Sequence, residues 1–249
     1  MVARELKSVL DWWASQGVDV PEVELPKPKP AKADANPQAK PEPAKAKPAK
    51  PPSQDTQALA AEASTLPELK AVLDRFESGA LTAGARQAVF ARGNADADVM
   101  IIGEAPGRDE DRHGLPFVGR SGKLLDKMMG AIGLDETGFY VTNVVNWRPE
   151  RNRTPNQDEI RLCQPFLFRH IELAKPKVLL LTGNVPLQAL TGETGIMRQR
   201  GHWRDVEVAG ATYPALPIYH PAFLLRQPAL KKDAWRDLLS LRAKLDGLA

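Results

Sequence analysis

Four short apolar segments, separated by helical patterns, constrain the fold of this chain more than any other feature. They read DVMIIG, FYVTNVV, KVLLLTG and LPIYH, at residues 98–103, 139–145, 177–183 and 216–220. Apolar strands that alternate with helices are typical of a parallel sheet covered on both faces. The sequence therefore predicts an α/β domain with a central, four-stranded, mainly parallel sheet. WRDVEV, at 203–208, is expected to add an edge hairpin strand.

Helix start signals lie between these strands. Thr65 and Glu68 flank a proline as a capping box, which predicts a helix as far as about residue 77. Ser121 is expected to cap the next helix, and Asn156 a long helix that ends near residue 174. A short helix is expected at about 185–191 and a last one at about 230–245.

The chain before position 57 differs in composition from the rest. Residues 1–20 contain an amphipathic helical pattern, which is expected to dock on its own domain or on an unknown partner. Residues 21–56 hold ten prolines among alanines and lysines, and are expected to form a disordered linker because they have little to bury. Residues 57–249 are predicted to form the globular domain.

Charge and cysteine content limit the class of protein. A net charge of +3 supplies no large positive field, so any nucleic-acid surface must be a local patch. The one cysteine, Cys163, excludes a disulfide framework and favours a reducing, cytoplasmic compartment. No apolar run approaches about 18 residues, so no membrane span is expected.

The stretch GEAPGRDED, at residues 103–111, ends the first strand in an acidic turn. It lacks the Gly-Lys-Ser/Thr ending of a phosphate-binding loop. Glu104, Asp109, Glu110 and Asp111 leave a metal site open, and a solvated turn is the alternative for Glu110 and Asp111. Glu104 differs from the others, because a charge directly after a buried strand needs a partner or a function.

Three further side chains stand in loops or at strand ends. Phe117 is either a core residue or a stacking platform. Asn143 is either a satisfied turn residue or an amide matched to the edge of a pyrimidine, and His220 is either a cap or a hydrogen-bond donor to a developing oxyanion. Ligands of such sheets bind beyond the carboxyl ends of the strands, so the strand-end loops are expected to meet at one edge.

Two segments have the character of a nucleic-acid contact. RPERNRTP carries three arginines among prolines, either a rigid basic loop suited to phosphates or scattered surface charges. HPAFLLR places leucines beside an arginine, either as core residues or as a wedge inserted between bases. The residues concerned are Arg148, Arg151, Arg153, Leu224, Leu225 and Arg226.

GEAPGRDED, GLPFVGRSG, TNVV, RPERNRTP and YHPAFLLR, in this order, closely resemble the motifs of the uracil-DNA glycosylase superfamily, specifically its type-4 branch. The resemblance covers about residues 66–245. It implies a three-layer α/β/α sandwich and a base-excision repair enzyme that hydrolyses the N-glycosidic bond of uracil in DNA. The substrate is expected to be single- or double-stranded DNA, and the enzyme a monomer.

The resemblance also implies roles for the base pocket. Phe117 is expected to stack on the extruded uracil, and the amide of Asn143 to bond its Watson–Crick edge, with Gly103 and Ala105 alongside. Cytosine presents the opposite donor and acceptor pattern, which leaves polar groups unpaired. Excision of another deaminated base, xanthine or hypoxanthine, and a non-catalytic DNA-binding relative are the alternatives.

The resemblance implies two further roles, because cleavage places negative charge on the base and positive charge on the sugar. His220 is expected to stabilise negative charge on uracil O2. Glu104, with Asp109 as the second choice, is expected to face the sugar cation and to orient the water. The basic loop and the HPAFLLR segment are expected to contact the DNA.

One departure from the type-4 pattern concerns a cofactor. Members of that branch usually hold a 4Fe-4S cluster on four cysteines, whereas only Cys163 remains here and Trp147 stands where another is usual. The sequence therefore predicts no metal or cluster, with Trp147 and apolar neighbours packing the vacated site.

A branch of the superfamily that bonds covalently to DNA uses a histidine in an inserted loop. Because no histidine lies between Trp147 and Arg169, hydrolysis is expected.

Overall fold

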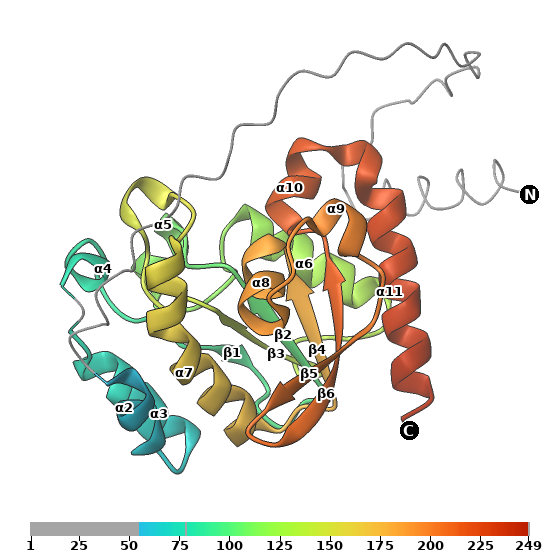
Figure 1. The fold of residues 1–249 in the computed structure, drawn as a ribbon. Coiled ribbons are helices and arrows are strands. Elements are labelled where there is room, and N and C mark those ends of the chain that lie inside the picture. The colour runs from blue at the N-terminus through green and yellow to red at the C-terminus, as the bar shows by residue number, and fades with distance from the viewer. Residues whose placement is uncertain (1–54, 78, 249) are drawn as a thin grey trace, which may run out of the picture.

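The computed structural model describes residues 55–77 and 79–248, and Figure 1 shows a sheet with helices on both sides. The predicted N-terminal helix and almost all of the predicted linker lie outside the described residues. Among the described helices, none is long and apolar enough to cross a membrane.

The centre of the domain is a six-stranded sheet in the order β1-β3-β2-β4-β6-β5. Strands β3, β2, β4 and β6 run parallel, and the edge strands β1 and β5 run antiparallel to their neighbours. The bounds are β1 Arg92–Gly93, β2 Val99–Gly103, β3 Phe139–Asn143, β4 Val178–Thr182, β5 Arg204–Val208 and β6 Ala211–Ile218. The four core strands and the edge strand are confirmed, whereas the short β1 was not predicted.

The parallel register brings the carboxyl ends of the core strands to one edge. Gly103 of β2 pairs with Asn143 of β3, and Thr182 of β4 pairs with Ile218 of β6. The loops that follow these strands therefore converge, as expected for a sheet of this kind.

Helices cover both faces of this sheet. Their bounds are α2 Thr56–Ala61, α3 Leu66–Arg75, α4 Ala80–Ala83, α5 Arg108–His113, α6 Arg120–Ala131, α7 Gln157–Ala174, α8 Asn184–Thr191, α9 Ile196–Gln199, α10 Pro221–Arg226 and α11 Lys231–Asp246. Two 3-10 turns, η1 Glu150–Asn152 and η2 Pro228–Leu230, complete the described elements.

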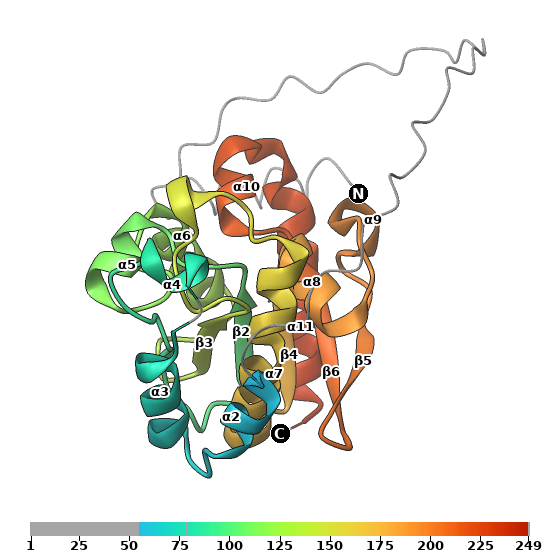
Figure 2. The ribbon, with the colours of Figure 1, turned by 60° about the vertical axis from the view of Figure 1, so that its left-hand side comes forward.

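Side chains of the strands alternate between two apolar cores. On β2, Met100 and Ile102 join the core that includes α2, α3 and α7, whereas Val99 and Ile101 join the core that includes α6 and α11. This is the period-two alternation of a strand buried on both faces. Figures 1 and 2 show the resulting layers from two directions, which confirms the predicted three-layer α/β/α sandwich.

Helix starts follow the predicted caps in two cases out of three. The side chain of Thr65 caps α3, and that of Asn156 caps α7. Helix α6 instead begins with Gly119 as its N-cap and without a side-chain cap, so the capping role predicted for Ser121 is wrong. Helix α2, which Asp55 caps, and helix α5, inside the acidic stretch, were not predicted.

Candidate active site

A cavity of about 470 Å³ opens where the core strands end. Elements far apart in the sequence line it: the β2–α5 turn, the start of α6, the end of β3, the loop before α7 and the start of α10. Among the residues predicted for the site, those that line the cavity are Glu104, Ala105, Phe117, Asn143, Arg153, His220 and Arg226. The predicted meeting of the strand-end loops at one edge is therefore confirmed.

The close approach of Phe117 and Asn143 depends on Gly103. A Cβ atom at position 103 would lie 2.5 Å from Cε2 of the Phe117 ring and would collide with Oδ1 of Asn143. A side chain there would push the ring and the amide apart. Gly103 thus belongs to the site through the space it leaves beneath both groups.

The loop that carries Phe117 is held in an uncommon conformation. Phe117 has a φ of +54°, in the left-handed region that non-glycine residues rarely adopt. Its carbonyl oxygen packs so closely on Gly122 that position 122 has no room for a Cβ atom. The ring itself is 6% exposed and lies against the ring of His220, with centroids 5.6 Å apart.

Glu110 clamps this loop, a role that the sequence did not reveal. Its Oε1 accepts hydrogen bonds from the N–H groups of Val118 at 3.0 Å and Gly119 at 2.9 Å, and its Oε2 accepts from the N–H of Gly107 at 3.1 Å. One carboxylate therefore ties the turn after β2 to the segment that follows Phe117. Of the two alternatives left open for Glu110, the solvated turn is therefore excluded by these three hydrogen bonds.

Asn143 places a buried amide group in the cavity. It is 3% exposed, lines the cavity, and its side chain makes no hydrogen bond with any described residue. Leaving a buried amide unpaired costs on the order of 1–3 kcal/mol. A ligand with both a donor and an acceptor on one edge would satisfy it.

His220 faces the cavity as a neutral imidazole. Its Nδ1 accepts a hydrogen bond from the N–H of Ala222 at 3.1 Å, which leaves the proton on Nε2. Burial, with a smaller effect of the positive charge on Arg226, lowers the pKa of His220 to about 4. The ring therefore caps α10, and its Nε2–H is left for another partner, so the cap does not exclude the predicted donor role.

Glu104 and Asp109, the two predicted carboxylates, occupy different surroundings. Glu104 lines the cavity, and burial raises its pKa, against a smaller lowering effect of the hydrogen bond from Thr154. Asp109 does not line the cavity; its side chain is 51% exposed and faces Arg108 at 3.8 Å. The geometry therefore favours Glu104. Thr154 lies fifty positions further along the chain, within the RPERNRTP motif, and its contact with Glu104 was not predicted.

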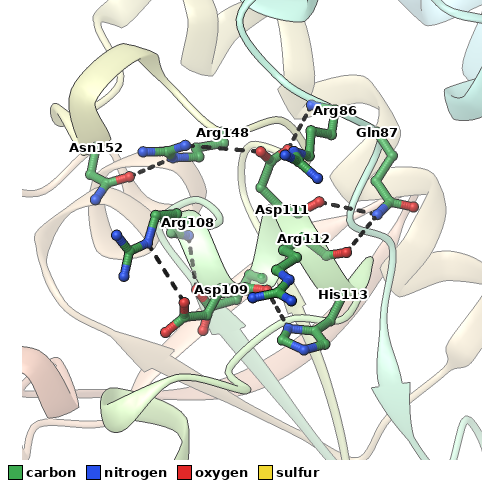
Figure 3. A network of polar contacts seen from close by, with 11 residues as sticks. Arg86, Gln87, Arg108, Asp109, Asp111, Arg112, His113, Arg148 and Asn152 are labelled. Atoms are coloured by element: carbon green, nitrogen blue, oxygen red, sulfur yellow. Dashed lines mark hydrogen bonds and ion pairs between the residues drawn. The ribbon is translucent and has the colours of Figure 1, made fainter.

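Asp111 lies in a polar network that joins α5 to the segments around Arg86 and Arg148 (Figure 3). It is 3% exposed, and its Oδ1 accepts a hydrogen bond from the N–H of Arg86 at 2.8 Å. Its Oδ2 lies 4.0 Å from Nη1 of Arg148, whose Nε donates to Asn152 at 2.6 Å. The solvated-turn expectation was therefore wrong for Asp111 as well. Arg148 is engaged in this network and does not itself line the cavity.

The other two arginines of the basic loop also differ from each other. The side chain of Arg151 is 90% exposed and lies 3.5 Å from Glu150. Arg153 lines the cavity but donates two hydrogen bonds to Glu159, at 2.6 and 2.7 Å. It thereby fastens the loop to the start of α7. Within this loop, Arg151 is the arginine best placed to reach a phosphate.

The wedge role expected for Leu224 needs correction. Leu224 is fully buried in the core shared with α6 and α11, so it cannot enter a DNA duplex without unpacking α10. Leu225 is half-buried and packs on the same core. Arg226 is exposed at the rim of the cavity.

The residues at the position of the usual cluster do not fit a four-thiolate group. Cys163 is the chain's one cysteine, and burial raises the pKa of its thiol to about 12. Within the described residues, no group of three or more His, Cys, Asp or Glu side chains could hold a metal. Trp147 is 3% exposed in the same core as Cys163, with its ring centroid 5.4 Å from that of Phe76. The predicted apolar packing is present.

Trp147→Ala is expected to lower the free energy of unfolding by about 3–5 kcal/mol, the usual cost of removing a buried large aromatic side chain. Urea unfolding measures this change. Trp147→Phe retains a ring beside Phe76 and is expected to lose less than half as much. An alanine variant as stable as the parent protein would contradict an anchoring role for Trp147.

Glu110→Gln is expected to lower the free energy of unfolding by about 2 kcal/mol, because a neutral amide cannot accept all three backbone hydrogen bonds. Thermal unfolding checks this expectation. Glu62→Gln is the control, since Glu62 pairs with Arg75 on the surface and such pairs contribute little. Equal effects of the two substitutions would argue against the clamp.

The α/β fold thus places an aromatic ring, a buried amide and a neutral imidazole around one cavity at the carboxyl ends of the core strands. A family model described as the uracil DNA glycosylase superfamily matches residues 90–239, which include every predicted site residue. The chain belongs to this superfamily.

The alignments with type-4 relatives cover most of the length of each relative. The chain is 40% identical over 146 residues to the type-4 uracil-DNA glycosylase of Archaeoglobus fulgidus. This alignment spans 57% of this chain and 73% of that protein. It is 37% identical over 158 residues to the type-4 enzyme of Pyrobaculum aerophilum, spanning 61% and 81%. It is 36% identical over 140 residues to that of Thermotoga maritima, spanning 55% and 71%.

Proposed function

We propose that this protein is a uracil-DNA glycosylase that hydrolyses the bond between uracil N1 and the deoxyribose C1′ during base-excision repair. The similarity to type-4 uracil-DNA glycosylases supports this activity. The observation that carries the proposal is the buried amide of Asn143, which has no hydrogen-bond partner among the described residues and lies beside the Phe117 ring in one cavity.

Recognition of uracil follows from these two side chains. The target nucleotide leaves the duplex at a cost of a few kcal/mol, which interactions in the pocket must offset. Stacking on Phe117 contributes roughly 1–3 kcal/mol. The Asn143 amide accepts from N3–H and donates to O4 of uracil. Cytosine offers an acceptor and a donor in the reverse places, so it leaves the amide unpaired.

Bond cleavage separates charge between the base and the sugar. The electron pair of the C1′–N1 bond moves to uracil and is delocalised onto O2. His220 donates its Nε2–H to that oxygen as a neutral hydrogen-bond donor, which a pKa of about 4 keeps neutral at physiological pH.

Glu104 completes the reaction on the sugar side. Its carboxylate stabilises positive charge at C1′ and accepts a proton from the water whose oxygen bonds to C1′. The raised pKa makes Glu104 a better proton acceptor than an exposed carboxylate. Arg151 and Arg226 are exposed beside the loops of the cavity and are assigned to the DNA backbone.

We also propose that the enzyme works as a cytoplasmic monomer without a resident metal or cluster. The single cysteine and its protonated, buried thiol support this assignment. Stoichiometric iron in protein purified without oxygen would contradict it.

One assay tests the activity directly. A labelled oligonucleotide with a single uracil is incubated with the protein and treated with alkali, which breaks the strand at an abasic site. Product from U:G, U:A and single-stranded substrates is expected. Cleavage of xanthine or hypoxanthine substrates but not uracil would favour the other deaminated bases, and binding without product would indicate a non-catalytic relative.

A further inference from the structure

The short helix α9 presents the most exposed large apolar side chain of the described residues, Met197, which is 56% exposed. Figures 1 and 2 place α9 at the same end of the sheet as α10, the end at which the cavity opens. The neighbouring Arg198 is also exposed, and its guanidinium makes no hydrogen bond or ion pair with a described residue. Met197 and Arg198, together called the α9 tip, thus place an exposed apolar side chain beside an exposed positive charge at the end of the sheet that carries the site.

Contacts on the C-terminal side of α9 hold this tip in place. Arg200 forms an ion pair with the buried Asp237, with Nε to Oδ2 at 2.7 Å, and donates to the carbonyl oxygen of Asp233 at 2.8 Å. The N–H of Gly201 donates to the carbonyl oxygen of Pro217 on β6 at 2.9 Å. A tip anchored in this way loses little conformational entropy when it binds a partner.

Contacts on the N-terminal side connect α9 to His220 of the candidate site. The N–H of Gly195 donates to Oδ1 of Asn184 at 2.8 Å. The residue before Asn184, Gly183, lies so close to His220 that a Cβ atom there would be 3.2 Å from the histidine Cβ. The α9 segment is therefore linked, through Asn184 and Gly183, to the side of the candidate site that carries His220.

The extrusion of a nucleotide leaves a gap in the DNA that the exposed side chain of Met197 could fill. A flipped base leaves a gap in the stack, and proteins that bend or open DNA often fill such a gap with an apolar side chain. Leu224, which was expected to do so, is fully buried. Met197 is apolar, exposed and flexible enough to fit an irregular gap. Arg198 beside it can contact a phosphate.

We propose that α9 is a second DNA-contacting element, in which Met197 packs against the base stack of a duplex next to the extruded nucleotide and Arg198 contacts a backbone phosphate. The partner is double-stranded DNA, because a single strand has no continuous stack to support. This inference rests on the proposed uracil-excising function for the direction in which DNA enters, and it assigns α9 to duplex binding.

Two variants test the proposal by binding rather than by catalysis. The probe is a duplex with a stable tetrahydrofuran abasic site, whose dissociation constant is measured by fluorescence anisotropy over a range of salt concentrations. Met197→Ser is expected to weaken duplex binding at least about fivefold, since burial of only part of a methionine side chain contributes about 1 kcal/mol. Arg198→Ala is expected to make the slope of log K against log salt concentration shallower by about 0.9, the value for one phosphate contact.

Matched substitutions on α11 provide the control. Leu239 is 48% exposed, and Arg242 pairs with Asp246 on the same helix, so Leu239→Ser and Arg242→Ala should leave duplex binding within twofold of the parent protein. Binding of a single-stranded oligonucleotide should change less than binding of the duplex in Met197→Ser, because a single strand has no continuous base stack for Met197 to contact.

Two outcomes would overturn the proposal: duplex binding by both variants equal to that of the parent, or an equal loss on duplex and single strands in Met197→Ser. A parent protein that binds the abasic duplex through α9 but releases no uracil would contradict the proposed activity and leave the α9 contact supported.

Discussion

Glu104→Gln is expected to lower the single-turnover rate constant for uracil excision by about 10²–10⁴-fold, the range typical of general acid–base catalysis. The substituted amide would keep the size and the hydrogen bonding of the side chain but could neither carry a negative charge nor accept the proton of the water. The substitution therefore removes the charge that opposes the developing sugar cation. Single-turnover measurements with the labelled oligonucleotide isolate this step from product release.

The pH dependence supplies an independent check on Glu104. Burial raises the pKa of this carboxyl, so it becomes protonated at a higher pH than an exposed glutamate. A protonated Glu104 is neutral and cannot act as the base. The rate of the parent protein is thus expected to fall as pH drops through the raised pKa, and the Glu104→Gln variant should lack this acid limb.

Asp109→Asn is the matched control, because Asp109 lies on the same loop with an exposed side chain outside the cavity lining. It is expected to excise uracil within a few-fold of the parent rate. Parent-like rates in both variants would exclude both carboxylates. A large loss in Asp109→Asn alone would mean that α5 reorganises when DNA binds.

The sequence predicted the site best where local rules determine structure. Apolar runs of five to seven residues marked the core strands, and a parallel sheet must gather their carboxyl ends. Glu104, Asn143 and His220 each stand at or directly after such an end. Their meeting in one cavity followed from topology, without knowledge of any side-chain contact.

Contacts between distant residues explain what could not be predicted. Glu110 binds N–H groups eight and nine residues later, and Thr154 reaches Glu104 from the loop before α7. Nothing local distinguishes such residues from ordinary surface polar groups. Leu224 illustrates a second limit, since the run FLL in α10 does not indicate which of its members faces the core. Packing against α6 and α11 decides that, and only the structure shows it.

The second large effect is expected at His220. His220→Ala should lower the rate constant for excision by about 10²–10³-fold, the usual effect of removing one donor to a developing oxyanion. The leaving uracil carries its negative charge at O2, and the alanine variant offers nothing to that atom. Single-turnover excision measures the loss, and binding of an uncleaved uracil duplex should weaken much less, because the charge develops only in the transition state.

Because His220 also caps α10, a second variant can separate its role in stability from its role in the reaction. The Nδ1 atom of His220 accepts from the N–H of Ala222, so His220→Ala should also lower the free energy of unfolding by about 1 kcal/mol. Asparagine is among the best N-cap residues, yet its short side chain cannot cap α10 and reach uracil O2 together. His220→Asn should therefore match the parent in stability and the alanine variant in rate. If the asparagine variant instead recovers the parent rate, the histidine acts by positioning α10, and another donor must stabilise the uracil anion.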